Sequence, residues 1–207
     1  MKKIKGLVAS VIAVSGVALF HHVALADDSS STKSTGSIEF TQSEAGALTL
    51  DHISKLSFGN QKTSGSSQVY YATLDEKDGK SVPNFVQVTD KRGSNAGWHL
   101  TVTQDAQFAN GTNVLTGAVL KLDKGILISE DDGLAPTINQ AISLTPGVAS
   151  DVINAKSEQG TGIWVGSFGS DNATGEKAIS LTVPGKTKKV KGEYSASLTW
   201  NLTDSPA

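Results

Sequence analysis

Short runs of alternating apolar and polar residues, separated by turn residues, constrain the fold of this chain most strongly. The clearest run lies near the C-terminal end, where Tyr194, Ala196, Leu198, Trp200 and Leu202 alternate with serine, threonine and asparagine. Successive side chains of a β-strand point to opposite faces, so this pattern predicts a strand with one buried and one solvated face.

Similar runs, rich in Val, Ile, Thr and aromatic residues, recur along the chain between clusters of Gly, Asn, Asp, Ser and Pro. This composition favours strands over helices, and one helical turn is expected, at 105–109. The pattern predicts an all-β fold, a single two-sheet β-sandwich that is Ig-like in the broad sense. The expected strands are 38–41, 69–74, 85–89, 98–103, 114–122, 125–129, 142–145, 163–168, 179–183 and 194–203.

The N-terminal segment has the order of features that marks a secretory signal peptide. Three lysines fall within the first five residues, an uncharged and mostly apolar stretch covers 6–20, and Ala24 and Ala26 supply the small residues that signal peptidase requires. The apolar stretch is short for a bilayer span. Cleavage after Ala26 is therefore expected, and an uncleaved N-terminal anchor is the alternative.

Cleavage defines three parts: a signal peptide (1–26), a flexible polar leader (27–36) and a β domain (37–207). The mature chain would hold 181 residues, with 15 basic and 20 acidic side chains and no cysteine. This acidic balance gives no reason to expect a nucleic-acid partner, and no membrane span is expected in the mature chain. Because the chain ends without a Leu-Pro-x-Thr-Gly sorting motif, we expect non-covalent retention at the surface.

The sequence contains no convincing catalytic or metal-binding set. Gly185-Lys186-Thr187 resembles the end of a phosphate loop but lacks its first glycine and is preceded by Pro184, which indicates a turn. The acidic run 130–132 fits a solvated turn better than a calcium site, and the acids at 75–78 lack the spacing of a calcium loop. A paired-carboxylate glycosidase stays open, because such pairs meet only in space. We expect no cofactor, no metal and no enzymatic activity.

Two copies of a Trp-x-Leu-Thr pattern carry a family resemblance. The first is at 98–101, and the second is at 200–203 and continues as Asp-Ser-Pro. Together with 115–118, 160–164 and 183–185, these motifs closely resemble the WxL domain family of Gram-positive surface proteins, over nearly the whole mature chain. Gly185 departs from the family pattern, in which a small residue such as alanine is common.

The resemblance implies non-covalent attachment to the cell wall, attributed to peptidoglycan or another wall polymer. It also implies work beside larger membrane-anchored, WxL-associated surface proteins, and no catalysis. The candidate binding residues are those of the two motifs and two further aromatic residues: Trp98, Leu100, Trp200, Leu202, Tyr194 and Trp164.

The alternation of side chains suggests different roles for the three tryptophans. Trp98 and Trp200 share faces with aliphatic neighbours, which favours burial, close together in one core, over open sugar-stacking platforms. Trp164 lies on the face opposite to Ile163 and Val165, so it is the candidate glycan platform or partner anchor. The lysines at 186, 188, 189 and 191 either meet an anionic wall polymer or an acidic partner, or form a solvated loop.

Two functions therefore compete, direct binding of the wall and docking of a larger surface protein with indirect wall contact. A sandwich offers free sheet edges for a second β-protein. Since few of the 12 aromatic residues remain outside the expected core, direct glycan affinity is expected to be the weaker of the two.

Overall fold

The computed structural model describes residue 38 and residues 48–207 of the chain. The chain divides into two units, 1–38 and 39–207, and the fold described below is that of the second unit. The predicted signal peptide with Ala24 and Ala26, the leader 27–36 and nearly all of the strand 38–41 lie outside the described residues.

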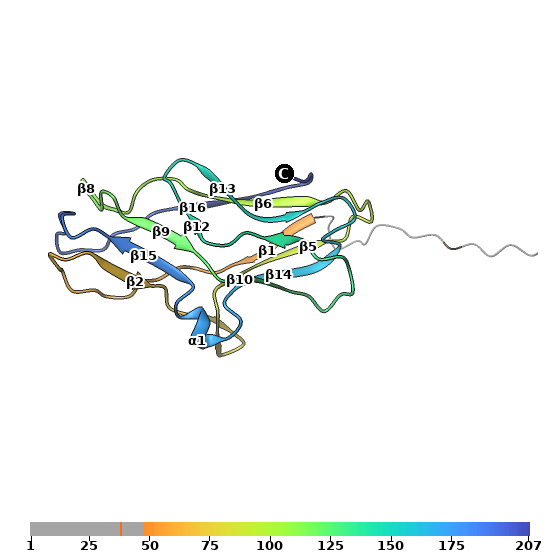
Figure 1. Cartoon of the computed structure of the whole chain (residues 1–207), viewed down its shortest axis with the longest axis horizontal. Helices are drawn as coiled ribbons and strands as arrows, with labels where there is room; N and C mark the ends of the chain where they lie inside the picture. Colours follow the sequence, from red (N-terminus) through yellow and green to blue (C-terminus); the bar gives the residue numbers. More distant parts are fainter. Residues whose placement is uncertain (1–37, 39–47) are drawn as a thin grey trace, which may run out of the picture. The chain divides into compact units, whose positions relative to one another are not determined.

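Antiparallel strands dominate the described residues, which confirms the predicted all-β class (Figure 1). The first sheet has the order β1 (Leu48–Ile53), β5 (Phe85–Asp90), β14 (Gly162–Phe168) and β10 (Gly125–Ile128). The second sheet has the order β11 (Thr137–Ile138), β13 (Ala149–Ala155), β6 (Trp98–Gln104) and β16 (Leu198–Thr203). The third sheet has the order β12 (Ile142–Ser143), β9 (Val119–Leu122), β15 (Ile179–Val183) and β2 (Gln68–Tyr71).

Two hairpins complete the described strands, β3 (Asp75–Lys77) with β4 (Lys80–Val82) and β7 (Ala109–Asn110) with β8 (Asn113–Val114). Hydrogen bonding thus divides the described strands into five sheets, so the predicted two-sheet sandwich is not confirmed. Asp78 and Gly79, which join β3 to β4, both have positive φ, as a type I′ hairpin turn requires. The acids at 75–78 therefore belong to a hairpin.

The helical turn predicted at 105–109 was wrong. This segment is extended and bonded to the chain that leads into β16: Asp105 N donates to Ser197 O, and Ala109 forms a bridge with Ser195. The described helix is instead α1 (Asn172–Gly175), whose N-cap Asp171 accepts a hydrogen bond from the backbone of Thr174. Tertiary pairing, rather than local propensity, decides the conformation of 105–109.

The core is formed by the inward faces of all three large sheets. Trp98, Leu100 and Val102 of β6 are 0% exposed. Leu120 of β9 and Ile179 of β15 belong to the same buried cluster. Among the described residues, no helix is long and apolar enough to cross a membrane.

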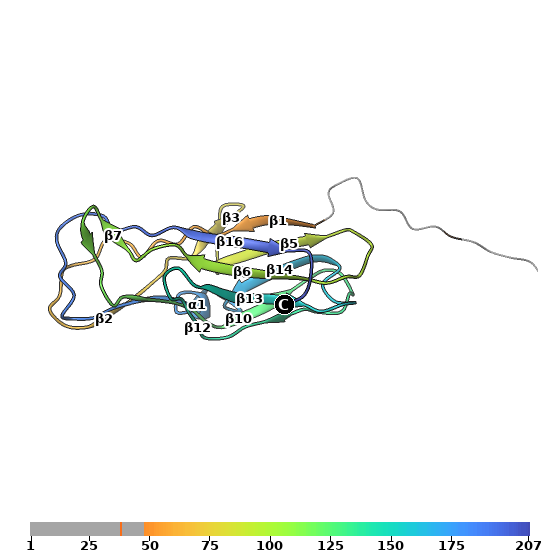
Figure 2. The same cartoon turned by 90° about the horizontal axis from the view of Figure 1, so that it is seen from above.

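Among the described strands, one edge of the first sheet and one edge of the second meet on the same side of the domain. β1 is an end strand of the first sheet and β16 is an end strand of the second. The two strands lie beside each other in Figure 2 and line a common hollow. One of the two strands that carry the Trp-x-Leu pattern therefore forms a wall of this hollow.

Candidate functional site

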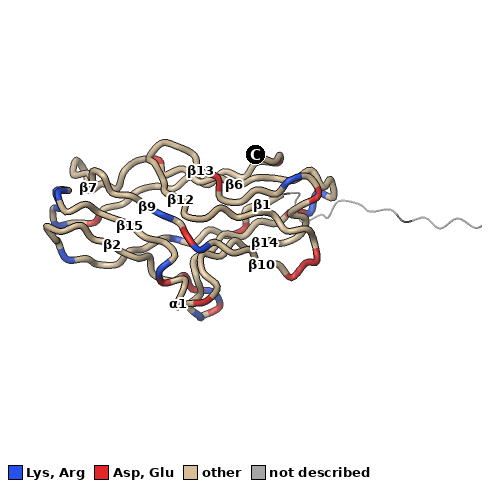
Figure 3. The backbone as a smooth tube through the Cα atoms, in the orientation of Figure 1, with Lys and Arg blue, Asp and Glu red and all other residues tan. Residues whose placement is uncertain are grey.

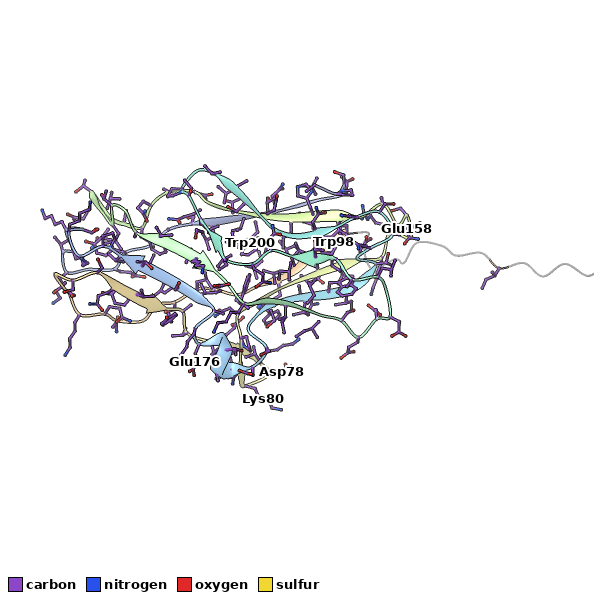
Figure 4. All side chains as sticks on the ribbon, viewed as in Figure 1. Asp78, Lys80, Trp98, Glu158, Glu176 and Trp200 are labelled. Atoms are coloured by element: carbon purple, nitrogen blue, oxygen red, sulfur yellow. The ribbon has the colours of Figure 1, made fainter. Side chains whose placement is uncertain are left out.

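The two Trp-x-Leu motifs lie on neighbouring, hydrogen-bonded strands. β6 and β16 are antiparallel, and their register places Leu100 directly opposite Leu202 and Val102 opposite Trp200. Trp98 and Trp200 therefore flank the leucine pair on opposite sides, related by a local two-fold axis. At about 3.4 Å per residue, four residue positions separate the tryptophan rows by about 14 Å along the strands. Figure 4 labels both tryptophans.

This pairing confirms that the two motifs are close in one core, and explains their shared spacing. Leucine at the third position of each motif meets its counterpart across the strand pair, where directly opposed side chains interact most strongly. The tryptophan at the first position of each motif then reaches a different neighbour at each end. Those neighbours give the two indoles different environments.

Trp98 is buried against a glycine turn formed by residues 160–162, here called the GTG turn. Its indole Nε1 donates to Gly160 O at 3.0 Å. Gly160 has φ +78°, and a Cβ at this position would lie 2.6 Å from Trp98 Nε1 and 2.6 Å from Ala155 Cβ. Glycine is needed because no side chain fits between the turn and the indole.

Trp164 is also buried, at 5% exposure, so the expectation that it forms an open platform was wrong. Its Nε1 donates to Thr161 O at 3.0 Å, which places the N–H groups of Trp98 and Trp164 on consecutive carbonyls of the GTG turn. The neighbouring Ile163 is the more exposed side chain, at 39%. The alternation separated the two faces of β14 correctly, but the tryptophan face is the inner one.

The acidic turn after β10 supports the opposite side of the GTG turn. Asp131 Oδ2 accepts a hydrogen bond from Ile163 N at 2.7 Å. Gly162 has φ +96°, and a Cβ there would overlap the Asp131 carboxylate. In the described part of the chain, no group of three or more His, Cys, Asp or Glu side chains is arranged to hold a metal ion. Asp131, within the acidic run 130–132, thus has a structural role, because it accepts the hydrogen bond from Ile163 N that supports the GTG turn.

Trp200 differs from the other two tryptophans because it is only partly buried. Its side chain makes no hydrogen bond with a described residue, and within the described part the only buried side-chain polar atom without a partner is Asn84 Oδ1. Among the described residues, the indole N–H of Trp200 thus has no acceptor. This tryptophan packs on the core with one part of its surface and lines the hollow with another.

The hollow between β1 and β16 has a volume of about 770 Å³. Its apolar lining comes from Leu48 and Leu50 of β1 and from Trp200 and Leu202 of β16. Its polar lining is Arg92, Asn201, Thr203 and Asp204. Half of the lining residues are polar or charged, and the hollow is open to solvent. It is therefore a candidate contact surface rather than the enclosed, mostly apolar pocket that is typical of small-ligand sites.

Arg92 fixes the C-terminal end of the second motif at this hollow. Its guanidinium donates to both carboxylate oxygens of Asp90, at 2.9 and 2.8 Å, to Gly97 O at 2.6 Å and to Asp204 O at 3.0 Å. The Asp90 side chain is only 3% exposed. The hydrogen bonds that Arg92 donates to the Asp90 carboxylate outweigh the effect of burial and raise the pKa of Arg92 above its usual value, so the guanidinium stays charged.

Two further contacts hold the residues after Asp204. His99 Nδ1 donates to Ser205 O at 2.8 Å, and Ala207 N donates to Asn154 Oδ1 at 3.4 Å. The Asp-Ser-Pro extension is thus bound across the second sheet, next to the first motif. Sequence reasoning did not find Arg92, Asp90 or β1, because no local pattern links them to a motif more than 100 residues away.

The remaining candidate, Tyr194, lies away from the hollow. It is partly buried, and its hydroxyl oxygen accepts a hydrogen bond from Val190 N at 3.0 Å. The structure therefore brings Trp98, Leu100, Trp200 and Leu202 together on two strands, gathers Trp98 and Trp164 at the GTG turn, and places Tyr194 at the lysine-rich loop.

The paired motif strands and the partly buried Trp200 belong to an all-β domain with a candidate contact surface between β1 and β16. A family model described as "WxL domain surface cell wall-binding" matches residues 27–206. The chain belongs to the WxL family, and membership places it at the extracellular cell-wall surface, in a class of binding domains. No curated protein and no solved structure matches the chain significantly.

Proposed function

We propose that the mature protein attaches non-covalently to Gram-positive peptidoglycan, and that the hollow between β1 and β16 is the contact surface. The observation that supports this most is the state of Trp200. It alone among the three tryptophans combines partial exposure with an indole N–H that has no partner in the described residues. An indole of this kind stacks on a sugar ring and donates to a ligand oxygen.

The lining of the hollow matches the chemistry of peptidoglycan. Leu48, Leu50 and Leu202 offer apolar contact to the ring faces and to the methyl groups of acetamido sugars and short peptides. Asn201 and Thr203 offer polar groups at the border. The guanidinium of Arg92 is paired with the Asp90 carboxylate and with backbone carbonyls, so it shapes the border of the hollow and adds no free charge. No covalent step is needed for this mode of attachment, and the protein acts without catalysis.

Docking of a larger WxL-associated surface protein is the second candidate, and it is favoured by two sheet edges that have no further partner among the described strands. β1 and β16 each end a sheet beside the hollow, and an unpaired edge accepts an added strand through main-chain hydrogen bonds. In that case Trp200 would pack against an apolar side chain of the added strand. Contact with the wall would then be indirect.

A substitution at the border of the hollow tests its use without disturbing the core. Asn201 is exposed and lines the hollow, so an arginine at this position fills part of the hollow. Asn201→Arg should lower the affinity of the mature protein for purified walls, measured by co-sedimentation, by at least about tenfold. Thr199→Arg is the matched control, because Thr199 is exposed on the same face of β16 but does not line the hollow. Equal loss in both variants, or no loss in either, would contradict the assignment of the hollow.

A further inference from the structure

An ordered loop carries lysines at the end of the domain where β15 ends and β2 begins. After Val183, the buried Thr187 donates from Oγ1 to Thr116 O at 2.7 Å, and its N–H donates to Pro184 O at 3.1 Å. Lys189 Nζ donates to the carbonyl oxygens of Pro184, Gly185 and Thr187, at 3.1, 3.4 and 2.9 Å. The Tyr194 hydroxyl fixes the far side of the loop through Val190 N. The loop is therefore held in one conformation.

These contacts leave three lysines directed to solvent. Lys186, Lys188 and Lys191 are exposed and belong to no salt bridge among the described residues, whereas Lys189 is occupied by carbonyl groups. A fourth exposed lysine, Lys62, comes from the adjacent loop 59–67: Gly185 N donates to Ser67 Oγ at 3.1 Å. Lys62, Lys186, Lys188 and Lys191 are here called the lysine tip.

The lysine tip is opposite in charge to the rest of the domain. The loops 59–67 and 184–193 contain five lysines and one acid, whereas the remainder of 48–207 contains nine basic and fifteen acidic residues. Figure 3 shows basic residues gathered at this end and acidic residues gathered in the turn after β10. Such segregation creates a local positive field that the net charge of the domain does not reveal.

We propose that the lysine tip binds a polyanionic, phosphodiester-bearing polymer of the cell wall. The ammonium groups come from two separate loops and do not line the hollow between β1 and β16, an arrangement that fits repeated anions along a chain. Because the loop is already ordered, little conformational entropy is lost when the polymer binds. This site is separate from the hollow, so it adds a second contact with the wall and does not depend on the peptidoglycan proposal.

The test compares two triple variants of the mature protein. The tip variant carries Lys186→Glu, Lys188→Glu and Lys191→Glu. The control variant carries Lys80→Glu, Lys156→Glu and Lys177→Glu, which have the same charge change at exposed lysines outside the tip and in no described salt bridge. Binding is measured on purified wall, on the same wall stripped of phosphodiester polymers by hydrofluoric acid, and with soluble polyphosphate as competitor. Unfolding curves establish that both variants are folded.

On unstripped wall, the tip variant should bind about 100-fold more weakly than the control at low salt, since a lysine near an anionic surface contributes roughly a fivefold affinity gain. The three substituted lysines should contribute about −2 to the slope of log affinity against log salt concentration in the control variant. Stripping the wall should remove the difference between the variants, and polyphosphate should compete only with the control and the unmodified protein.

Three results would overturn the proposal: equal binding of both variants to unstripped wall, a difference that persists on stripped wall, or no competition by polyphosphate. Self-association that is lost in the tip variant, seen by sedimentation velocity, would identify the acidic turn of a second copy as the partner instead. Residual binding of the tip variant to stripped wall measures the affinity of the hollow for the remaining wall. Failure of the lysine-tip proposal and failure of the hollow proposal are therefore distinguishable.

Discussion

Gly160→Ala is predicted to destabilise the domain strongly, because the GTG turn supports the indole of Trp98. An alanine at φ +78° costs about 1–2 kcal/mol for its backbone conformation alone. The new Cβ would lie 2.6 Å from Trp98 Nε1, and overpacking of this kind costs about 1–3 kcal/mol. Displacing the turn also lengthens the 3.0 Å bond from Nε1 to Gly160 O, and a buried donor left without a partner costs about 1–3 kcal/mol. The free energy of unfolding should fall by about 3–8 kcal/mol.

A second glycine separates the cost of conformation from the cost of the clash. Gly147 has φ +79°, and a Cβ there would meet no atom within 4 Å. Gly147→Ala should therefore cost only the backbone term of about 1–2 kcal/mol. Urea unfolding of the mature protein, followed by tryptophan fluorescence, measures both. Equal losses for Gly147→Ala and Gly160→Ala would refute the argument that the turn is built around Trp98.

Four further substitutions test the tryptophan environments, the Arg92–Asp90 pair and the Asp75 carboxylate. Trp98→Ala should lower the free energy of unfolding by about 3–5 kcal/mol, and Trp200→Ala by clearly less because its side chain is only partly buried; denaturant unfolding that gives the opposite order would contradict the assigned environments. Arg92→Ala leaves the Asp90 carboxylate buried without its partner, so the free energy of unfolding should fall by about 3–5 kcal/mol in the same assay. A fall below about 1 kcal/mol would contradict the role of the Arg92–Asp90 ion pair. Burial raises the pKa of Asp75, but its hydrogen bonds outweigh this effect and lower the pKa below the ordinary 3.8. The stability that Asp75 contributes is therefore complete above pH 3.8 and is lost as the pH falls through the lower pKa of the folded state. The difference in unfolding free energy between wild type and Asp75→Asn should shrink over that range, and a difference that grows on acidification would contradict the direction of the shift.

Five strands were predicted within one residue of their observed bounds: β5, β6, β10, β14 and β15. The predicted run 194–203 contains β16, whose regular pairing begins only at Leu198. The alternation of apolar and polar residues predicted burial of both motif tryptophans, which is correct for Trp98, whereas Trp200 is only partly buried. The repeated motif predicted that the two strands share one core.

The strands that escaped prediction contain irregularities that alternation does not represent. β13 shifts register between Asp151 and Ile153, which buries the adjacent Val152 and Ile153, and β1 shifts between Leu50 and His52. A β-bulge of this kind breaks the period of two. The predicted run 114–122 is likewise divided by a turn at Gly117, whose φ is +77°.

The candidate site was only partly predictable for a different reason. A local pattern separates the two faces of a strand but does not say which face another sheet covers, and this is why Trp164 was expected at the surface. The hollow depends on Leu48, Leu50 and Arg92, which reach Trp200 only through the arrangement of two sheets. The sequence shows these residues but no signal that brings them together.

Direct, non-covalent attachment to the wall is tested most directly by one binding measurement. Purified mature protein is titrated onto wall freed of all protein and onto the same wall retaining its surface proteins, and bound protein is released with salt or denaturant. The account predicts equal, saturable and fully reversible binding to both preparations. Binding confined to the wall that retains its proteins would contradict it and identify the protein as a docking module for another surface protein.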